Sequence, residues 1–190
     1  MTIQLPRGNY TAITIIYNND QKQTVNNQAT AAHAVTIAHA GTSGIVVGSN
    51  GEHQSLSIVE TNIVTKSIRD ALDLYKLQDI PVITNVASQS TAALSIGVHG
   101  SITAAANFAP DLLFNVWDSY NKGKAGEALD LQRKLSVVEA RCKVGGVAGI
   151  KYATSLIYNT NPKPRKPLRE LSEDIKEIVR SGIWLLKGAA

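Results

Sequence analysis

A short polar loop at residues 48–52 (GSNGE) carries the side chains of this sequence that are best placed for chemistry. It directly follows residues 44–47 (GIVV), an apolar run of the kind that is buried in parallel sheets. A hydroxyl and an amide just beyond such a strand lie where substrate-binding groups of α/β proteins are found. The residues alone support equally a second interpretation, in which the glycines make a tight turn that caps the next helix.

The histidines do not have the spacing of a metal site. His33 and His39 are not three or four residues apart, so they do not share a helix face as a pair of ligands would. His53 and His99 have no cysteine or carboxylate cluster at ligand spacing. We therefore expect no metal, and nothing in the sequence calls for a cofactor.

The single cysteine, Cys142, cannot form an internal disulfide, which suits a reducing cytosol. Arg141 and Lys143 flank it and could lower its pKa. The favoured interpretation is still an inert thiol on a helix. Residues 1–9 contain no apolar stretch of a secretory signal, so we expect a cytoplasmic protein.

Composition is that of an ordinary globular domain, with 190 residues, 44% hydrophobic and 18% charged. No apolar run is long enough to span a membrane. The net charge is +4, and its basic residues gather at residues 163–169, where prolines interrupt them. Aromatic residues make up only 5% of the chain, so the stacking side chains of a nucleic-acid site are scarce. We expect neither a membrane protein nor a nucleic-acid-binding protein.

The first half of the chain alternates between strand and helix patterns. Strands are predicted at residues 10–17, 44–47 and 80–86, and helices at residues 27–40 and 58–74. Gly41 ends the first helix, and Ser57 can cap the second, with Ile63, Ile68 and Leu72 as inward candidates. This alternation predicts a parallel α/β sheet.

The second half is mostly helical. A short helical piece is predicted at residues 88–96, a strand at 100–107, and helices at 110–120, 126–144, 151–158 and 172–186. Acidic residues at 173 and 174 open the last helix, as the helix dipole prefers. The sequence shows no internal repeat.

The loop at residues 48–52, followed by Leu56-Ser57 and Glu60, resembles the signature of the dihydrodipicolinate synthase and N-acetylneuraminate lyase family. Its Ser-Asn version is most similar to the 4-hydroxy-2-oxoglutarate aldolase branch. Residues 80–83 resemble the third strand of this family, and Ser90-Thr91 resembles the start of the helix that follows it.

The second half carries a second block of the same resemblance. Residues 97–110 resemble the eighth strand of the family, and residues 123–135 resemble its Gly-X-X-X-Glu-Ala helix. Residues 149–151 and 164–168 (PRKPL) resemble the helical tail of the aldolase branch. The two blocks meet near residues 91–96, where the family has its strands four to seven.

The resemblance implies an α/β fold, a partial (β/α)8 TIM barrel with about half of the strands and a C-terminal helical tail. A complete barrel takes about 250 residues. We expect the partial barrel at residues 1–110 and the C-terminal helices at 111–190. In a closed barrel the retained strands are neighbours, which predicts the order eight-one-two-three.

The resemblance also implies the chemistry. In this family a lysine attacks the ketone of pyruvate or another 2-oxo acid, and the resulting iminium is the electron sink for making or breaking a carbon–carbon bond. By resemblance, Ser49 is the relay hydroxyl, Ser49 and Asn50 bind the substrate carboxylate, and Gly48, Gly51 and Glu52 shape the loop. The strand with the Schiff-base lysine and the loop with the relay tyrosine are missing.

The sequence around one lysine resembles the missing Schiff-base strand. Gly149-Ile150-Lys151 has the Gly-X-Lys pattern of the Schiff-base strand, but its spacing to Leu168 fits the family's tail without a gap. Lys151 is therefore expected on a helix outside the barrel.

Three functions remain open. The first is an aldolase-family lyase with an incomplete active site. The second is a non-catalytic half-barrel that associates with itself or with a full-length paralogue, because unpaired outer strands invite pairing. The third is a small-molecule binder that uses the Ser49 loop, although half a barrel offers little concave volume. The second describes this chain best, and the first describes its ancestry.

Overall fold

The computed structural model describes residues 8–22, 24–47, 56–85 and 87–188, and these divide into two compact units. Met1–Val86 and Ala92–Ile102 belong to the first, which we call the sheet unit. Ala87–Thr91 and Thr103–Ala190 belong to the second, the helical unit. The expected boundary between residues 110 and 111 stays a prediction.

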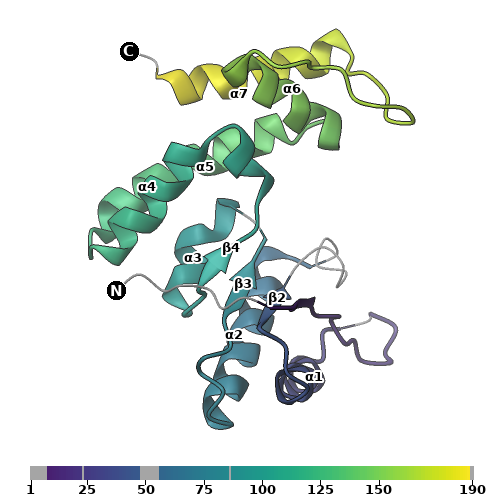
Figure 1. Cartoon of the computed structure of the whole chain (residues 1–190), viewed down its shortest axis with the longest axis vertical. Coiled ribbons are helices and arrows are strands. Elements are labelled where there is room, and N and C mark those ends of the chain that lie inside the picture. Colours follow the sequence, from purple (N-terminus) through teal and green to yellow (C-terminus); the bar gives the residue numbers. More distant parts are fainter. Residues whose placement is uncertain (1–7, 23, 48–55, 86, 189–190) are drawn as a thin grey trace. The chain divides into compact units, whose positions relative to one another are not determined.

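The sheet unit is built on four parallel strands, β1 (Tyr10–Ala12), β2 (Gly44–Val47), β3 (Val82–Thr84) and β4 (Gly100–Ser101). Figure 1 shows them in the order β1-β2-β3-β4. β2 and β3 are short and apolar, and β3 is buried along its whole length. The predicted parallel α/β sheet is confirmed.

The predicted strand order is wrong. We expected the segment that resembles the eighth strand to lie beside β1, but β4 pairs with β3, with Ile83 opposite Gly100. The connection at residues 85–99 contains only one short α-helix, which is what a parallel crossover to the adjacent strand needs. Reaching the far side of β1 would require crossing two more strands, each about 4.8 Å wide. Without four intervening strands, the free edge of β3 is the nearest partner.

Two helices of the sheet unit match the prediction closely, α1 (Asn27–His39) and α2 (Ile58–Leu74), and they pack against each other. Ser57 accepts a hydrogen bond from the Glu60 N–H, while the Glu60 carboxylate accepts one from the Ser57 N–H, a capping box that fixes the start of α2. Ile68 and Leu72 are buried as predicted, whereas Ile63 is exposed.

Three strands are shorter than predicted, and one of them, β3, spans only Val82–Thr84 of the predicted residues 80–86. β1 ends at Ala12, although Ile13 and Ile15 beyond it are buried. The stretch predicted as a strand at residues 100–107 holds β4 and then a 3-10 helix, η4 (Ala104–Asn107). The Thr103 hydroxyl accepts a hydrogen bond from the Ala105 N–H and so turns the chain into η4.

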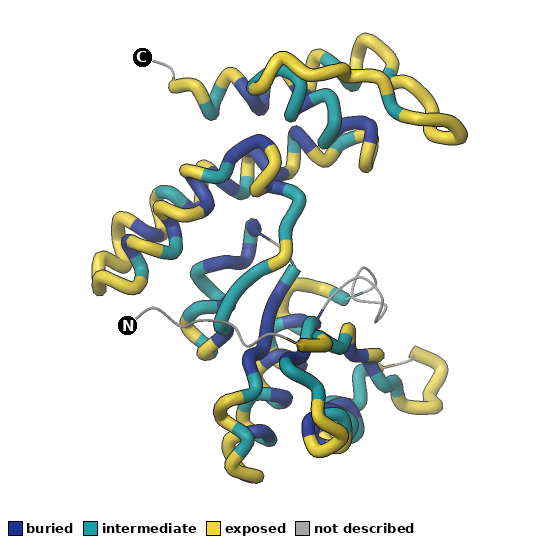
Figure 2. The backbone as a smooth tube through the Cα atoms, in the orientation of Figure 1, coloured by how far each residue is buried: buried dark blue, intermediate teal, exposed yellow. Residues whose placement is uncertain are grey.

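The helical unit contains η3 (Ala87–Gln89), η4 and the helices α4 (Pro110–Asn121), α5 (Ala125–Cys142), α6 (Gly146–Tyr158) and α7 (Glu173–Lys187). The short α3 (Ser90–Ser95) crosses the border between the units. Within the helical unit α5 packs against α4 and α7, and α6 packs against α7. In Figure 2 each of these helices carries a buried stripe, and the core they form includes Phe108, Leu135, Val138 and Val179.

Glycine lets α5 and α7 approach closely. A Cβ atom on Gly182 of α7 would lie 3.0 Å from both the Arg141 Cβ and the Cys142 Sγ of α5.

In the described part of the chain no helix is both long and apolar enough to cross a membrane.

A histidine ties β4 to β3. The His99 N–H donates to the Val82 oxygen over 2.9 Å, and the Val82 N–H donates to the His99 Nδ1 over 3.2 Å. Partial burial and the nearby Arg69 guanidinium lower the pKa of His99 from its ordinary 6.5. The neutral ring is therefore the form that accepts the hydrogen bond at the edge of β3.

This geometry predicts a stability that depends on pH. The unfolded chain takes up the His99 proton first as the pH falls below about 6.5, so the free energy of unfolding declines from there down through the lowered folded pKa. His99→Gln keeps a possible acceptor for the Val82 N–H but does not titrate. Urea midpoints measured between pH 7.5 and 5 should fall less in His99→Gln than in the wild type. His39→Gln, which removes an exposed histidine, is the control, and equal pH slopes in all three proteins would contradict the assignment.

Candidate functional site

The carboxyl edge of the sheet is where the predicted loop begins. β2, β3 and β4 end in register, with Val47 opposite Thr84 and Thr84 opposite Ser101. In the sequence the predicted loop follows directly after Val47. The residues predicted to form the site, Gly48, Ser49, Asn50, Gly51 and Glu52, lie outside the described residues. Their roles stay predictions, and the described part of this edge consists of the ends of β2, β3 and β4.

Two polar side chains at the end of β3 were not predicted as site residues. Thr84 is only 2% exposed, and its backbone oxygen accepts a hydrogen bond from the Ile102 N–H over 2.8 Å. Asn85 follows it, and its Oδ1 is buried with no hydrogen-bond partner in the described part of the chain. A buried unpaired oxygen costs about 1–3 kcal/mol, so it is retained at functional sites more often than elsewhere. Asn85 therefore joins the candidates at this edge.

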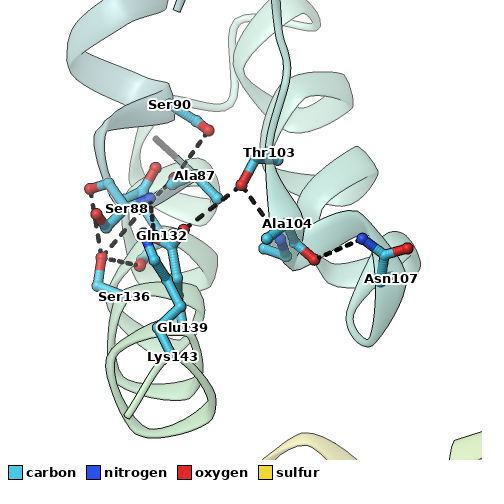
Figure 3. Close-up of polar contacts among 11 residues, drawn as sticks. Ala87, Ser88, Ser90, Thr103, Ala104, Asn107, Gln132, Ser136, Glu139 and Lys143 are labelled. Atoms are coloured by element: carbon cyan, nitrogen blue, oxygen red, sulfur yellow. Dashed lines mark hydrogen bonds and ion pairs between the residues drawn. The ribbon is translucent and has the colours of Figure 1, made fainter. Parts of the chain in front are cut away.

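A second polar constellation lies within the helical unit, on the face of α5 that meets the η3 turn (Figure 3). Glu139 is 2% exposed and Gln132 is 5% exposed, which is unusual for such side chains. Both belong to a helix whose neighbouring buried positions, Leu135 and Val138, are apolar. This cluster was not predicted, although Gln132, Ser136 and Glu139 have the spacing of one helix face, which could have indicated it.

The α5 side chains satisfy the backbone of the turn at residues 87–91. The Glu139 Oε2 accepts the Ser88 N–H over 2.7 Å, and the Gln132 Oε1 accepts the Thr91 N–H over 3.1 Å. Gln132 also donates through Nε2 to the Ala87 oxygen over 3.0 Å. Two N–H groups and one carbonyl oxygen of the turn are thereby hydrogen-bonded to α5.

The other oxygen of Glu139 faces the segment that follows β4. The Thr103 hydroxyl lies 3.4 Å from the Glu139 Oε1, and the Lys143 Nζ lies 3.6 Å from the same oxygen (Figure 3). One carboxylate thus joins the start of η3 to the start of η4. Lys143 is partly exposed and balances a charge that would otherwise be costly to bury.

This arrangement is better suited to holding loops than to chemistry. The N–H groups of Ser88 and Thr91, which an anionic substrate could use, already have α5 acceptors. Glu139 itself is occupied by a backbone donor, a hydroxyl and an ammonium group. The cluster therefore fixes the segments that follow β3 and β4, and the Ser49 loop remains the better candidate for binding a carboxylate.

The remaining reactive side chains do not form a site. Lys151 lies in α6, as predicted from its place in the tail. Cys142 is buried, and its burial raises the pKa of the thiol to about 12, so Arg141 and Lys143 do not activate it. Among the described residues, no three histidine, cysteine or acidic side chains gather closely enough to hold a metal ion.

Neutralising the buried carboxylate should destabilise the protein more than neutralising an exposed one. In Glu139→Gln the amide keeps one acceptor but loses the charge-assisted hydrogen bond from Ser88 and the pairing with Lys143, so we expect a loss of about 1–3 kcal/mol in the free energy of unfolding. Asp130→Asn on the same helix breaks an exposed pair with Arg133 and should cost at most about 0.5 kcal/mol. Urea unfolding measures both. Hydrogen exchange of the Ser88 amide should accelerate only in Glu139→Gln, and an unchanged rate would contradict the role of Glu139.

Comparisons with known proteins agree with the resemblance. Residues 91–184 match the model of the Dihydrodipicolinate synthetase family. A protein of Coccidioides immitis (strain RS), named as a mitochondrial 4-hydroxy-2-oxoglutarate aldolase, is 36% identical over 96 residues, 46% of this chain and 30% of that protein. The L-threo-3-deoxy-hexylosonate aldolase of Hypocrea jecorina is 36% identical over 87 residues, 46% of this chain and 28% of that protein. The chain thus spans about a third of the length of these curated relatives.

Solved structures show the same fold. A monomeric variant of dihydrodipicolinate synthase matches with a TM-score of 0.67 at 18% sequence identity, over 93% of this chain and 64% of that chain. This likeness shows that the four parallel strands and their helices form part of a (β/α)8 barrel, as predicted. The match and the relatives lead to one conclusion: residues 91–184 carry a Dihydrodipicolinate synthetase family domain, and the chain as a whole is similar to proteins of that family.

Proposed function

We propose that this chain is a member of the pyruvate-dependent Schiff-base aldolases that is inactive on its own. It keeps part of the substrate-binding edge of the barrel and lacks the amine that does the chemistry. The observation that carries this proposal is the direct pairing of β3 with β4. In the described sheet no strand lies between them, so the place where the family would have strands four to seven is closed.

The chemistry demands an amine at the mouth of the barrel. A lysine forms an iminium with the ketone of pyruvate only if its environment lets it lose a proton and holds it beside the substrate. Every lysine of this chain lies on a helix or in a turn or loop, and none lies on a strand of the described sheet. Lys151, which imitates the Schiff-base pattern, is one turn into the helix α6. These placements support the absence of a nucleophile.

The substrate-binding part is proposed to persist. Ser49 and Asn50 would hold the carboxylate of pyruvate or another 2-oxo acid, Ser49 would supply the relay hydroxyl, and Gly48, Gly51 and Glu52 would shape the loop. The strand before this loop ends in register with the end of β3. Binding without turnover is the expected behaviour, and it requires no cofactor.

Borohydride trapping tests the missing amine. When the purified chain is mixed with pyruvate and sodium borohydride, an iminium would be reduced to a stable secondary amine, which intact-protein mass spectrometry detects. We expect no adduct, because no lysine lies on a strand of the described sheet. The full-length L-threo-3-deoxy-hexylosonate aldolase of Hypocrea jecorina is the positive control.

The site of any adduct would decide between explanations. A single adduct mapped to Lys151 would overturn the proposal and restore an active aldolase. Lys151→Arg, which keeps the charge but cannot form an iminium, would then abolish trapping, while Lys134→Arg would leave it intact.

A second candidate function is association through the open sheet. Four parallel strands are half of the eight in a closed barrel, and in the described part of the chain β4 pairs with β3 alone. Exposed strand edges pair readily with other chains. We propose that the chain associates with itself or with a full-length paralogue and acts there as a binding or regulatory subunit in the cytoplasm.

Sedimentation velocity over a wide concentration range tests this association. We expect the weight-average mass to rise with concentration, because an open sheet edge gains backbone hydrogen bonds on pairing. A full-length relative added in equal amount should co-sediment with the chain. A monomer at every concentration, with no co-sedimentation, would exclude the association while leaving the proposed lack of catalysis untouched.

A further inference from the structure

A groove in the helical unit is separate from the edge of the sheet and from the polar stripe of α5. It lies where the start of α4, the middle of α5 and the ends of α6 and α7 meet, and we call it the α4–α7 groove. Its volume is ≈ 390 Å³, within the range of about 300–1,000 Å³ that is usual for small-molecule sites. All of its lining residues belong to the helical unit, so its shape does not depend on the placement of the sheet unit.

The floor of the groove is apolar. Phe108 and Leu112 are buried in the core of the unit, and Leu131, Ile157 and Leu186 are partly buried against that core. These five side chains come from four helices and from the turn before α4, so the floor is not the flank of one helix. Covering such a strip with an unbranched hydrocarbon chain would be favourable by about 25 cal/mol for each Å² removed from water.

The rim of the groove carries an excess of positive charge. Lys134 and Lys187 line it together with a single carboxylate, Asp111. Neither lysine forms an ion pair within the described ranges, and the Lys187 Nζ has only the Leu156 oxygen at 3.5 Å. The nearest acidic residue on α5, Asp130, is paired with Arg133. Tyr158, half exposed at the same rim, offers a hydroxyl donor.

We propose that the α4–α7 groove binds an amphipathic monocarboxylate, a molecule with an unbranched apolar chain and one terminal carboxylate. The chain would lie on the apolar floor, and the carboxylate would meet the ammonium groups of Lys134 and Lys187. Two unpaired cations against one rim carboxylate favour an anionic head group over a neutral or cationic one. This site is independent of the proposed aldolase ancestry, because it uses no residue of the sheet.

The test compares three ligands that share a ten-carbon chain. Decanoate, decanol and decyltrimethylammonium are titrated below their aggregation thresholds into the full chain and followed by amide NMR shifts. Decanoate should bind and shift resonances of residues in α4, α5, α6 and α7, and decanol should bind at least about fivefold more weakly. The cation should not bind there. Equal binding of decanoate and decanol would overturn the carboxylate assignment.

Variants locate the site. Lys134→Gln and Lys187→Gln are exposed substitutions that should leave the fold intact, as circular dichroism can verify, and each should weaken decanoate binding by about fivefold. Lys166→Gln, at an exposed lysine in the loop between α6 and α7, should bind decanoate as the wild type does. The proposal would be overturned if the folded wild type did not bind decanoate, or if both groove variants bound it with unchanged affinity. It would also be overturned if self-association of the chain covered the groove and decanoate binding was lost as a result.

Discussion

The parallel pairing of β3 with β4 decides which side chains can meet at the carboxyl edge of the sheet. The register places Val47, Thr84 and Ser101 side by side, so the segments that follow three strands begin at one edge. The pair is joined by backbone hydrogen bonds and by His99, whose ring accepts the Val82 N–H. If four further strands stood between β3 and β4, the same residues would belong to distant parts of a closed barrel. The set of side chains that can act together at this edge therefore follows from one strand contact.

In the helical unit, hydrogen bonds from buried side chains take the place of strand pairing. There the buried amide of Gln132 and carboxylate of Glu139 hold the turn at residues 87–91, and Glu139 reaches the Thr103 hydroxyl as well. These groups act where no sheet ladder is available to satisfy the backbone. Because each lies on an otherwise apolar face of α5, the cluster costs stability unless every polar atom finds a partner. The Gln132 and Glu139 side chains all have hydrogen-bond partners. Through these bonds α5 fixes the conformation of the turn, although α5 begins more than thirty residues later in the chain.

Local patterns predicted the elements well and their partners poorly. α1, α2, α4 and α7 have strong signals in helical spacing and in caps such as Ser57 and Glu60, and these are short-range properties. The position of β4 was predicted wrongly because it was taken from a complete barrel, whereas strand order in a shortened chain depends on which edge the connection can reach. The strand predicted at residues 100–107 is cut short by Thr103, whose hydroxyl offers the backbone a competing hydrogen bond. Glu139 and Gln132 were missed because the sequence does not distinguish a buried polar residue from a surface one. The difference lies in a hydrogen-bond partner that is far away in the sequence.

Polar groups that already have hydrogen-bond partners stabilise this protein, whereas polar groups without partners are the ones that can bind a ligand. In the cluster of Gln132, Ser136 and Glu139 the polar atoms already have partners, so a ligand would have to break good hydrogen bonds to use them. At the end of β3 the Asn85 Oδ1 has none in the described structure, and at the α4–α7 groove two ammonium groups lack carboxylates. At Asn85 a ligand gains by supplying the missing partner, because the cost of burying that oxygen has already been met in the folded state. The groove lysines are exposed, so there a ligand gains only the pairing of a solvated charge. If this chain lacks the Schiff-base amine, as proposed, binding can outlast catalysis in it, because the aldol chemistry would end while these groups stay in place.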